Sequence, residues 1–307
     1  MNKVSARQKR INFTGWMFML PALVFGTVFL IVPIVMCFVF SFTDFYMLRP
    51  ESTLFVGFEN YADLFSDAIF GKAITNTLLF VVVVVPLQCL LALVLALLVN
   101  KRWRGYGVFK LAYFAPVITS MTVVALLFQI FYQRDGGIFN LLLSLFGVEA
   151  QGFLQDEGQA MLCICFMSVW QGAGYQMIIF LAGLQGVSRE LYEAADIDAA
   201  NAWDKLVHIT LPSIAPVTGF VVIITLVGAF KVFTQVQIMT NGGPNNSTIT
   251  VVYYIFQKGM SEQLVGYGSA ISMLFTLVFV AASLLRGGAA KGVGLYRRYR
   301  ERVLGGY

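Results

Sequence analysis

Six long apolar runs constrain the fold of this chain more than any other feature. They cover residues 16–43, 74–99, 111–132, 160–185, 213–238 and 267–285. A bilayer hydrocarbon core of about 30 Å is crossed by roughly 20 apolar residues in a helix, so each run is long enough to span it. A β-barrel would need alternating segments of about 10 residues, and stretches such as VVVVV and LLALVLALL do not alternate. The chain is therefore predicted to be an all-α polytopic membrane protein with six transmembrane helices.

The first run follows a basic N-terminus, which raises the alternative of a cleaved signal peptide. The apolar core of a signal peptide is only about 7–15 residues long, so we expect a retained span instead. Composition agrees with a membrane protein, because only 12% of the residues are charged, against about 25% in ordinary soluble domains.

The basic residues predict the orientation of the chain. Six spans place both termini on one side of the membrane. If that side is the cytoplasm, the inside segments hold 16 Lys and Arg residues and the outside segments hold 4. This bias follows the positive-inside rule and places the segment between the fourth and fifth runs in the cytoplasm. The basic tail, residues 286–307, is interpreted as an anchor attracted to anionic lipid rather than as a nucleic-acid patch.

That cytoplasmic segment is charged and amphipathic, and residues 192–212 read YEAADIDAANAWDKLVHITLP. Ser188 can cap a helix whose first turn carries Glu190, and Asn201 with Asp204 resembles a second cap. We expect a short helix, a bend and a second short helix that runs into the fifth span at Pro212. Each helix places a set of its residues on one side. They are Leu191, Ala194 and Ala195 in the first helix and Trp203, Leu206, Val207 and Thr210 in the second.

Two roles are considered for this segment. Small alanines beside Glu193 make a knob that can enter a shallow groove and meet a basic side chain of a soluble partner. The alternative is a hairpin lying on the lipid headgroups. Helices of that kind favour Lys and Arg, whereas Arg189 stands here against four acidic residues: Glu190, Glu193, Asp196 and Asp198.

Polar residues inside the fourth and fifth runs indicate a pathway, because such groups are costly in lipid and usually face a bundle interior. Ser168, Gln171 and Tyr175 share one helical face, and Trp170 lies beside them. Aromatic rings suit the CH surfaces of sugars, and their polar tips can bond hydroxyl groups. The fifth run adds Thr225, Lys231, Thr234 and Gln235. Hydrogen bonding between helices is the alternative for these polar groups, and Lys231 either lines the pathway or extends to the outer interface.

Proline and glycine residues suggest further shaping of the spans. Pro86 and Pro116 are expected to cause local kinks. Gly172 and Gly174 permit either close helix packing or an unwound turn, and the sequence leaves both open.

No catalytic constellation is recognisable in the sequence. The single histidine is His208, and the four cysteines all fall within apolar runs at Cys37, Cys89, Cys163 and Cys165. These residues exclude a metal site with several His ligands and favour small apolar packing roles for the cysteines. No phosphate-binding G-x-x-x-x-G-K-[ST] loop is found either. The chain is therefore not expected to be an enzyme, and any ATP hydrolysis must belong to a partner.

The cytoplasmic segment resembles the EAA loop of permease subunits of binding-protein-dependent ABC importers. The resemblance rests on Glu193, Ala194, Ala195, Asp198 and the closing ITLP at 209–212. Residues 57–80, 136–147 and 233–248 are similar, in the same order, to segments of carbohydrate-type permeases. The usual glycine of the loop falls on Ala199. Because alanine continues a helix better than glycine does, a displaced bend is expected.

The resemblance implies a type I ABC importer permease fold in a bacterial plasma membrane. Residues 1–73 would hold the N-terminal tail, first span and first external loop, and residues 74–285 the transmembrane domain with its EAA loop at 186–212. That loop would be the coupling helix, and the residues implied in contact with the ATPase are Leu191, Glu193, Ala194, Ala195, Asp198 and Ala199. Spans four and five would line the cavity, and Ser168, Gln171, Tyr175 and Thr225 fall at matching positions.

The implied partners are a second homologous permease, two cytoplasmic ATPase subunits that bind ATP and Mg²⁺, an external sugar-binding protein and a carbohydrate. No cofactor is expected on this chain. A secondary transporter driven by an ion gradient is the alternative, and it would need intramembrane carboxylates or a histidine. An integral-membrane enzyme is disfavoured because the chemical constellations are missing.

Overall fold

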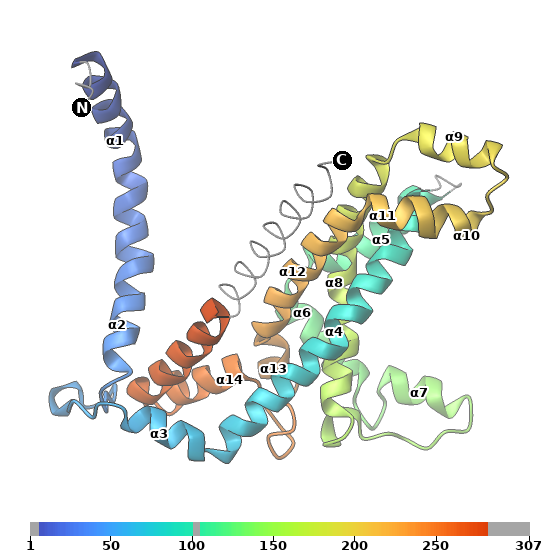
Figure 1. The fold of residues 1–307 in the computed structure, drawn as a ribbon. Helices are drawn as coiled ribbons and strands as arrows, with labels where there is room; N and C mark the ends of the chain where they lie inside the picture. The colour runs from blue at the N-terminus through green and yellow to red at the C-terminus, as the bar shows by residue number, and fades with distance from the viewer. Residues whose placement is uncertain (1–5, 101–104, 282–307) are drawn as a thin grey trace, which may run out of the picture. The chain divides into compact units, whose positions relative to one another are not determined.

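The computed structural model describes residues 6–100 and 105–281 (Figure 1). The predicted basic tail at 286–307 lies outside this range. The described residues are helical apart from turns, loops and two isolated β-bridges. The chain divides into two compact units. One combines Met1–Ser66 with Ile255–Tyr307, and the other is Asp67–Tyr254. The predicted division after residues 73 and 285 concerns membrane topology and stays a prediction.

The first unit contains a long apolar helix near the N-terminus. It is built from α1, a π-helical turn η1 and α2, and none of its residues from Thr14 to Phe40 is buried within the described chain. Asn60 of α3 donates to the carbonyls of Ser41 and Thr43, which ties the end of this helix to α3. The elements of this unit are α1 (Ala6–Gly26), η1 (Thr27–Ile31), α2 (Val32–Phe40), η2 (Pro50–Ser52), α3 (Glu59–Ser66), η5 (Gln257–Ser261) and an apolar helix over Val265–Ala281.

The second unit is a helical bundle organised around two long helices, α4 (Ala68–Asn100) and α8 (Ala160–Gln185), which lie side by side in Figure 1. Small residues let them approach closely, because Ala92, Ala96 and Ala173 are completely buried between them. The other elements are α5 (Tyr106–Ile118), α6 (Met121–Phe131), α7 (Ile138–Ser144), η3 (Phe153–Gln155), α9 (Arg189–Ile197), α10 (Ala202–Lys205), η4 (Leu206–Thr210), α11 (Leu211–Ser213), α12 (Ala215–Phe230), α13 (Thr234–Met239) and α14 (Val251–Phe256).

Two of the predicted spans are not single straight helices. The third run is broken after Ile118, and α5 meets α6 at 101°. The break lies shortly after Pro116, while α4 runs through Pro86 without interruption. The fifth run begins with a 67° bend between α11 and α12. It also ends earlier than predicted, because α12 stops at Phe230 and Lys231 follows it in non-helical backbone.

The described helices account for all six predicted runs. Three are long and apolar enough to cross a membrane alone: Thr14–Phe40, Ala68–Asn100 and Ala160–Gln185. The two bent pairs can each provide one more span, and the shorter helix Val265–Ala281 corresponds to the sixth run as far as it is described. The all-α prediction is confirmed.

Candidate functional site

The charged segment after α8 forms the short helix α9, which projects from the end of the bundle in Figure 1. Its first turn is organised as predicted, because Ser188 Oγ accepts a hydrogen bond from the Glu190 amide at 3.2 Å. A cap of this kind satisfies a backbone donor that has no partner inside the helix. The sequence therefore fixes where α9 begins.

α9 ends at Ile197 and the bend follows at Ala199, so the expected displacement of the bend is wrong. Ala199 adopts a left-handed conformation with φ +55°. Its amide donates to the Asp196 carbonyl at 3.1 Å, and the Ala200 amide donates to the Ala195 carbonyl at 2.9 Å. This pair of bonds is the Schellman motif that commonly ends helices at a glycine. The two bonds hold alanine in the backbone conformation that glycine adopts most readily.

A second helical stretch returns toward the bundle and is tied to α9. Asn201 and Asp204 form the predicted capping box at the start of α10. The chain continues through the π-helical turn η4 and through α11 into α12. Two contacts link α9 to this second stretch. They are a 2.9 Å hydrogen bond between the hydroxyl groups of Tyr192 and Thr210 and an ion pair between Lys205 and Asp196. The element formed by residues 188–213 is therefore hydrogen-bonded to itself and continuous with α12.

The outer side of this element presents a mixed apolar and acidic surface. Ile197 is 87% exposed and Trp203 is 68% exposed. Of the residues predicted to contact an ATPase, Ala195 is buried, whereas the others are exposed: Leu191, Glu193, Ala194, Asp198 and Ala199. An exposed apolar surface beside carboxylates is suited to docking a partner protein.

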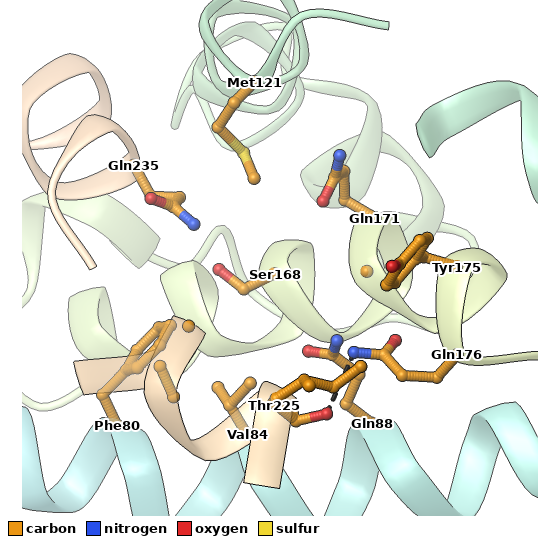
Figure 2. A pocket seen from close by; sticks show the side chains of 14 residues that line it. Phe80, Val84, Gln88, Met121, Ser168, Gln171, Tyr175, Gln176, Thr225 and Gln235 are labelled. Atoms are coloured by element: carbon orange, nitrogen blue, oxygen red, sulfur yellow. Dashed lines mark hydrogen bonds between the residues drawn. The ribbon is translucent and has the colours of Figure 1, made fainter. Parts of the chain in front are cut away.

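A cavity of about 240 Å³ lies among α4, α6, α8, α12 and α13. Five predicted pathway residues line it together: Ser168, Gln171, Tyr175, Thr225 and Gln235. Figure 2 shows the side chains of Ser168, Gln171 and Gln235 ending around an open centre. The structure thus brings together polar residues from two separate runs of the sequence.

Several of these polar groups also bond within the protein. Ser168 and Thr225 donate to carbonyls one turn earlier in their own helices, at 2.8 and 2.7 Å. Gln171 donates to the Pro116 carbonyl at 3.3 Å, close to the break between α5 and α6. A break in a membrane helix leaves backbone carbonyl groups without their helical donors, and these carbonyls must accept hydrogen bonds from other groups. Gln171 therefore supports the helix break and lines the cavity.

Two predicted pathway residues do not line the cavity. The Trp170 ring packs on Phe128, with 5.3 Å between the ring centroids, and belongs to an aromatic cluster between α6 and α8. Lys231 is exposed beyond the end of α12, where a cation is favoured by the helix dipole. Their placement in the pathway is therefore not supported by the structure.

The prediction missed two glutamines of the cavity wall, Gln88 on α4 and Gln176 on α8. The signal for Gln88 was present, because it is the only amide in the run 74–99 beyond its first turn. Gln176 follows Tyr175 and lies off the helical face used for the prediction. It lines the cavity because α12 approaches that side of α8, where its amide meets Thr225.

Gly172 and Gly174 allow neighbouring groups to pack closely against α8. They do not form an unwound turn, because α8 is helical throughout. A Cβ atom added at Gly174 would lie 2.1 Å from the Tyr113 carbonyl oxygen. A Cβ atom added at Gly172 would lie 2.3 Å from Gln88 Nε2. The two glycines thus bring α5 and the Gln88 side chain against α8.

Comparison with known proteins identifies the family. Residues 88–291 match the family described as "Binding-protein-dependent transport system inner membrane component". The arabinooligosaccharides transport system permease protein AraP of Bacillus subtilis is 35% identical over 91% of this chain and 90% of its own length. The lactose transport system permease protein LacF of Rhizobium radiobacter is 33% identical over 94% of this chain and 97% of its own.

A solved structure shows the same fold. A chain of the bacterial alginate ABC transporter, crystallised with an alginate pentasaccharide-bound periplasmic protein, superimposes with a TM-score of 0.81. It covers 92% of this chain and 96% of its own length at 22% identity, and the predicted type I importer permease fold is confirmed. The chain belongs to the family of inner-membrane components of binding-protein-dependent transport systems.

Proposed function

We propose that this member of the family is a permease subunit that carries an oligosaccharide or related carbohydrate across the membrane in an ATP-driven importer. The observation that carries the proposal is the capped element at 188–213, which is exposed, self-bonded and continuous with α12. Its other end leads to the cavity wall at Thr225. The sugar class is supported by the relatives named for arabinooligosaccharides and lactose.

The assembly proposed for this function contains a second homologous permease, two cytoplasmic ATPases that bind ATP and Mg²⁺, and an external sugar-binding protein. The positive-inside bias supports a cytoplasmic position for both termini and for the element at 188–213. Movement of the ATPases would be transmitted through α9 and α10 to α12, so that the cavity opens alternately to each side. In this scheme the chain transmits the movement of the ATPases and provides the pathway for the sugar, and the ATPase partners hydrolyse ATP.

A secondary transporter driven by an ion gradient is less well supported. Coupling to protons or sodium ions uses carboxylates or histidines within the membrane. The helices α4, α8 and α12, which wall the cavity, contain no Asp, Glu or His.

The function is tested by reconstituting the complete importer in proteoliposomes and measuring sugar uptake and ATP hydrolysis together. A panel of arabinotriose, lactose and maltose, each with the cognate binding protein, should include a sugar that is taken up only with ATP inside. Hydrolysis should rise several-fold when the loaded binding protein is added. Uptake that persists in vesicles lacking the ATPase subunits would contradict the proposal.

A further inference from the structure

A second cavity, of about 740 Å³, lies between the beginnings of α4 and α8 and residues 245–247. α8 leads from this cavity to the element at 188–213, so the cavity lies at the opposite end of the bundle. The proposed orientation places that end at the outer face of the membrane. None of the residues assigned to ATPase coupling or to the sugar pathway lines this cavity.

The wall of the cavity is held in place by bonds between α4 and the loop that follows α13. Asn76 Nδ2 donates to the carbonyls of Asn246 and Ile249 at 3.0 and 2.9 Å. Lys72, one turn earlier on α4, donates from Nζ to the Asn245 carbonyl at 3.2 Å. Asn245 and Asn246 adopt φ values of +46° and +60°, which asparagine tolerates better than most residues do. The protein therefore forms this wall with its own bonds.

Two opposite charges lie on this wall. Lys72 binds the Asn245 carbonyl, and Glu157 accepts a hydrogen bond from the Asn245 side-chain amide. Within the described chain, no ion pair joins Lys72 to Glu157 directly. Both side chains are exposed, and each can bind a further group, because an ammonium group has three donors and a carboxylate has about four acceptor sites. A molecule that carries both a phosphate and an ammonium group would meet an opposite charge at each end.

The rest of the cavity is apolar and lies deeper in the membrane. Leu79 follows Lys72 by seven residues, which is about 10 Å along the helix axis. Leu79 is 41% exposed and Leu162 of α8 is 54% exposed, and both line the cavity.

The length of α4 sets the level of the charged wall. Its 33 residues make a helix of about 50 Å, which is longer than a hydrocarbon core of about 30 Å. Lys72 precedes the apolar run at 74–99. The charged wall therefore lies at the level of the lipid headgroups, and the two leucines lie at the level of the acyl chains, where a soluble protein does not reach.

We propose that this cavity binds a zwitterionic phospholipid of the outer leaflet whose headgroup carries a primary ammonium group, as phosphatidylethanolamine does. Lys72 binds the phosphate, Glu157 binds the ammonium group, and one acyl chain lies along Leu79 and Leu162. The lipid bridges α4 and the start of α8 and so stabilises the outer end of the bundle. The inference takes only the orientation of the chain from the proposed function and does not depend on the sugar.

The test uses the complete importer in phosphatidylcholine vesicles that contain a small fraction of phosphatidylethanolamine with a diazirine in one acyl chain. After illumination, the labelled peptides are identified by mass spectrometry. Label should appear in the peptides that cover residues 71–79 and 157–162. Unlabelled phosphatidylethanolamine should compete for the site. Phosphatidylglycerol should not, because it lacks an ammonium group and would bring a second negative charge to Glu157.

Two variants separate the charges, and two others serve as matched controls. Lys72→Gln removes a charge-assisted bond to the phosphate and should lower labelling of these peptides about tenfold. Glu157→Gln should also lower labelling, and phosphatidylglycerol should then compete as well as phosphatidylethanolamine. Arg134→Gln and Glu149→Gln make the same changes of charge at exposed positions between α6 and α8 and should be labelled as the wild type is. Melting curves report on the folding of each variant.

Two results would overturn the inference. Equal labelling of these peptides in the wild type and in all four variants would mean that Lys72 and Glu157 do not hold the headgroup. Absence of label from both regions would mean that the second permease or the binding protein fills the cavity in the assembly. Sugar uptake is measured in the same vesicles. ATP-dependent uptake without labelling would leave the proposed function standing, whereas labelling without any uptake would contradict the proposed function alone.

Discussion

At the scale of single residues, Ala199 connects sequence and conformation most directly. A Cβ atom makes the left-handed backbone region unfavourable by about 1 kcal/mol, yet Ala199 occupies it at φ +55°. The hydrogen bonds of the Schellman motif and the capping box that follows hold the bend in place. The sequence identified the residue, but propensity alone predicted a displaced bend. The bonds that decide the conformation come from neighbouring residues.

Ala199→Gly should therefore stabilise the end of α9 by about 1 kcal/mol, because glycine removes the steric cost of a positive φ. Hydrogen exchange of the peptide covering residues 189–205 should slow by about fivefold. Ala194→Gly, inside the same helix, is the control and should speed exchange by a similar factor. Faster exchange in Ala199→Gly would show that the bend is not held at residue 199.

At the scale of elements, the sequence predicts what is local and fails where a second helix decides. The apolar runs and the caps at Ser188 and Asn201 are read from neighbouring residues, and they are confirmed. Only a local kink was predicted at Pro116, and not the 101° bend after Ile118. The bend depends on another helix, because Gln171 of α8 donates a hydrogen bond to the Pro116 carbonyl beside the break. Trp170 was placed in the pathway by its neighbours in sequence, whereas its contact is with Phe128 of α6.

Close packing between α5 and α8 depends on Gly174. In Gly174→Ala the new methyl group would collide with the Tyr113 backbone, which cannot move as a flexible side chain can. The substitution should destabilise the bundle by about 1–3 kcal/mol, as overpacking does elsewhere. The thermal midpoint of the purified subunit should fall by several degrees. Gly219→Ala on α12, where a Cβ atom meets nothing within 4 Å, is the matched control and should leave the midpoint unchanged or raise it. Equal loss in both variants would contradict a specific contact.

At the scale of the whole molecule, the charge bias predicts which ends of the helices face the cytoplasm. Ile197 at the end of α9 and Phe146 after α7 are both more than 80% exposed, so cysteines placed there should react readily. A membrane-impermeant maleimide should label Ile197→Cys only in inverted vesicles and Phe146→Cys only in right-side-out spheroplasts. The native cysteines should be replaced by serine or alanine first. The opposite pattern of labelling would reverse the orientation and remove the docking role from the element at 188–213.

Coupling across the whole assembly is tested at Glu193, which is exposed on α9. If this carboxylate meets a basic residue of the ATPase, Glu193→Lys places two like charges together, and a lost interfacial charge pair costs about 2–5 kcal/mol. The ATPase should then co-purify at least tenfold less, and sugar uptake should fall with it, while the chain remains inserted. Glu149→Lys makes the same charge change in the exposed α7–α8 connection and should preserve both properties. Because the two variants differ only in position, equal behaviour would mean that α9 does not hold the ATPase.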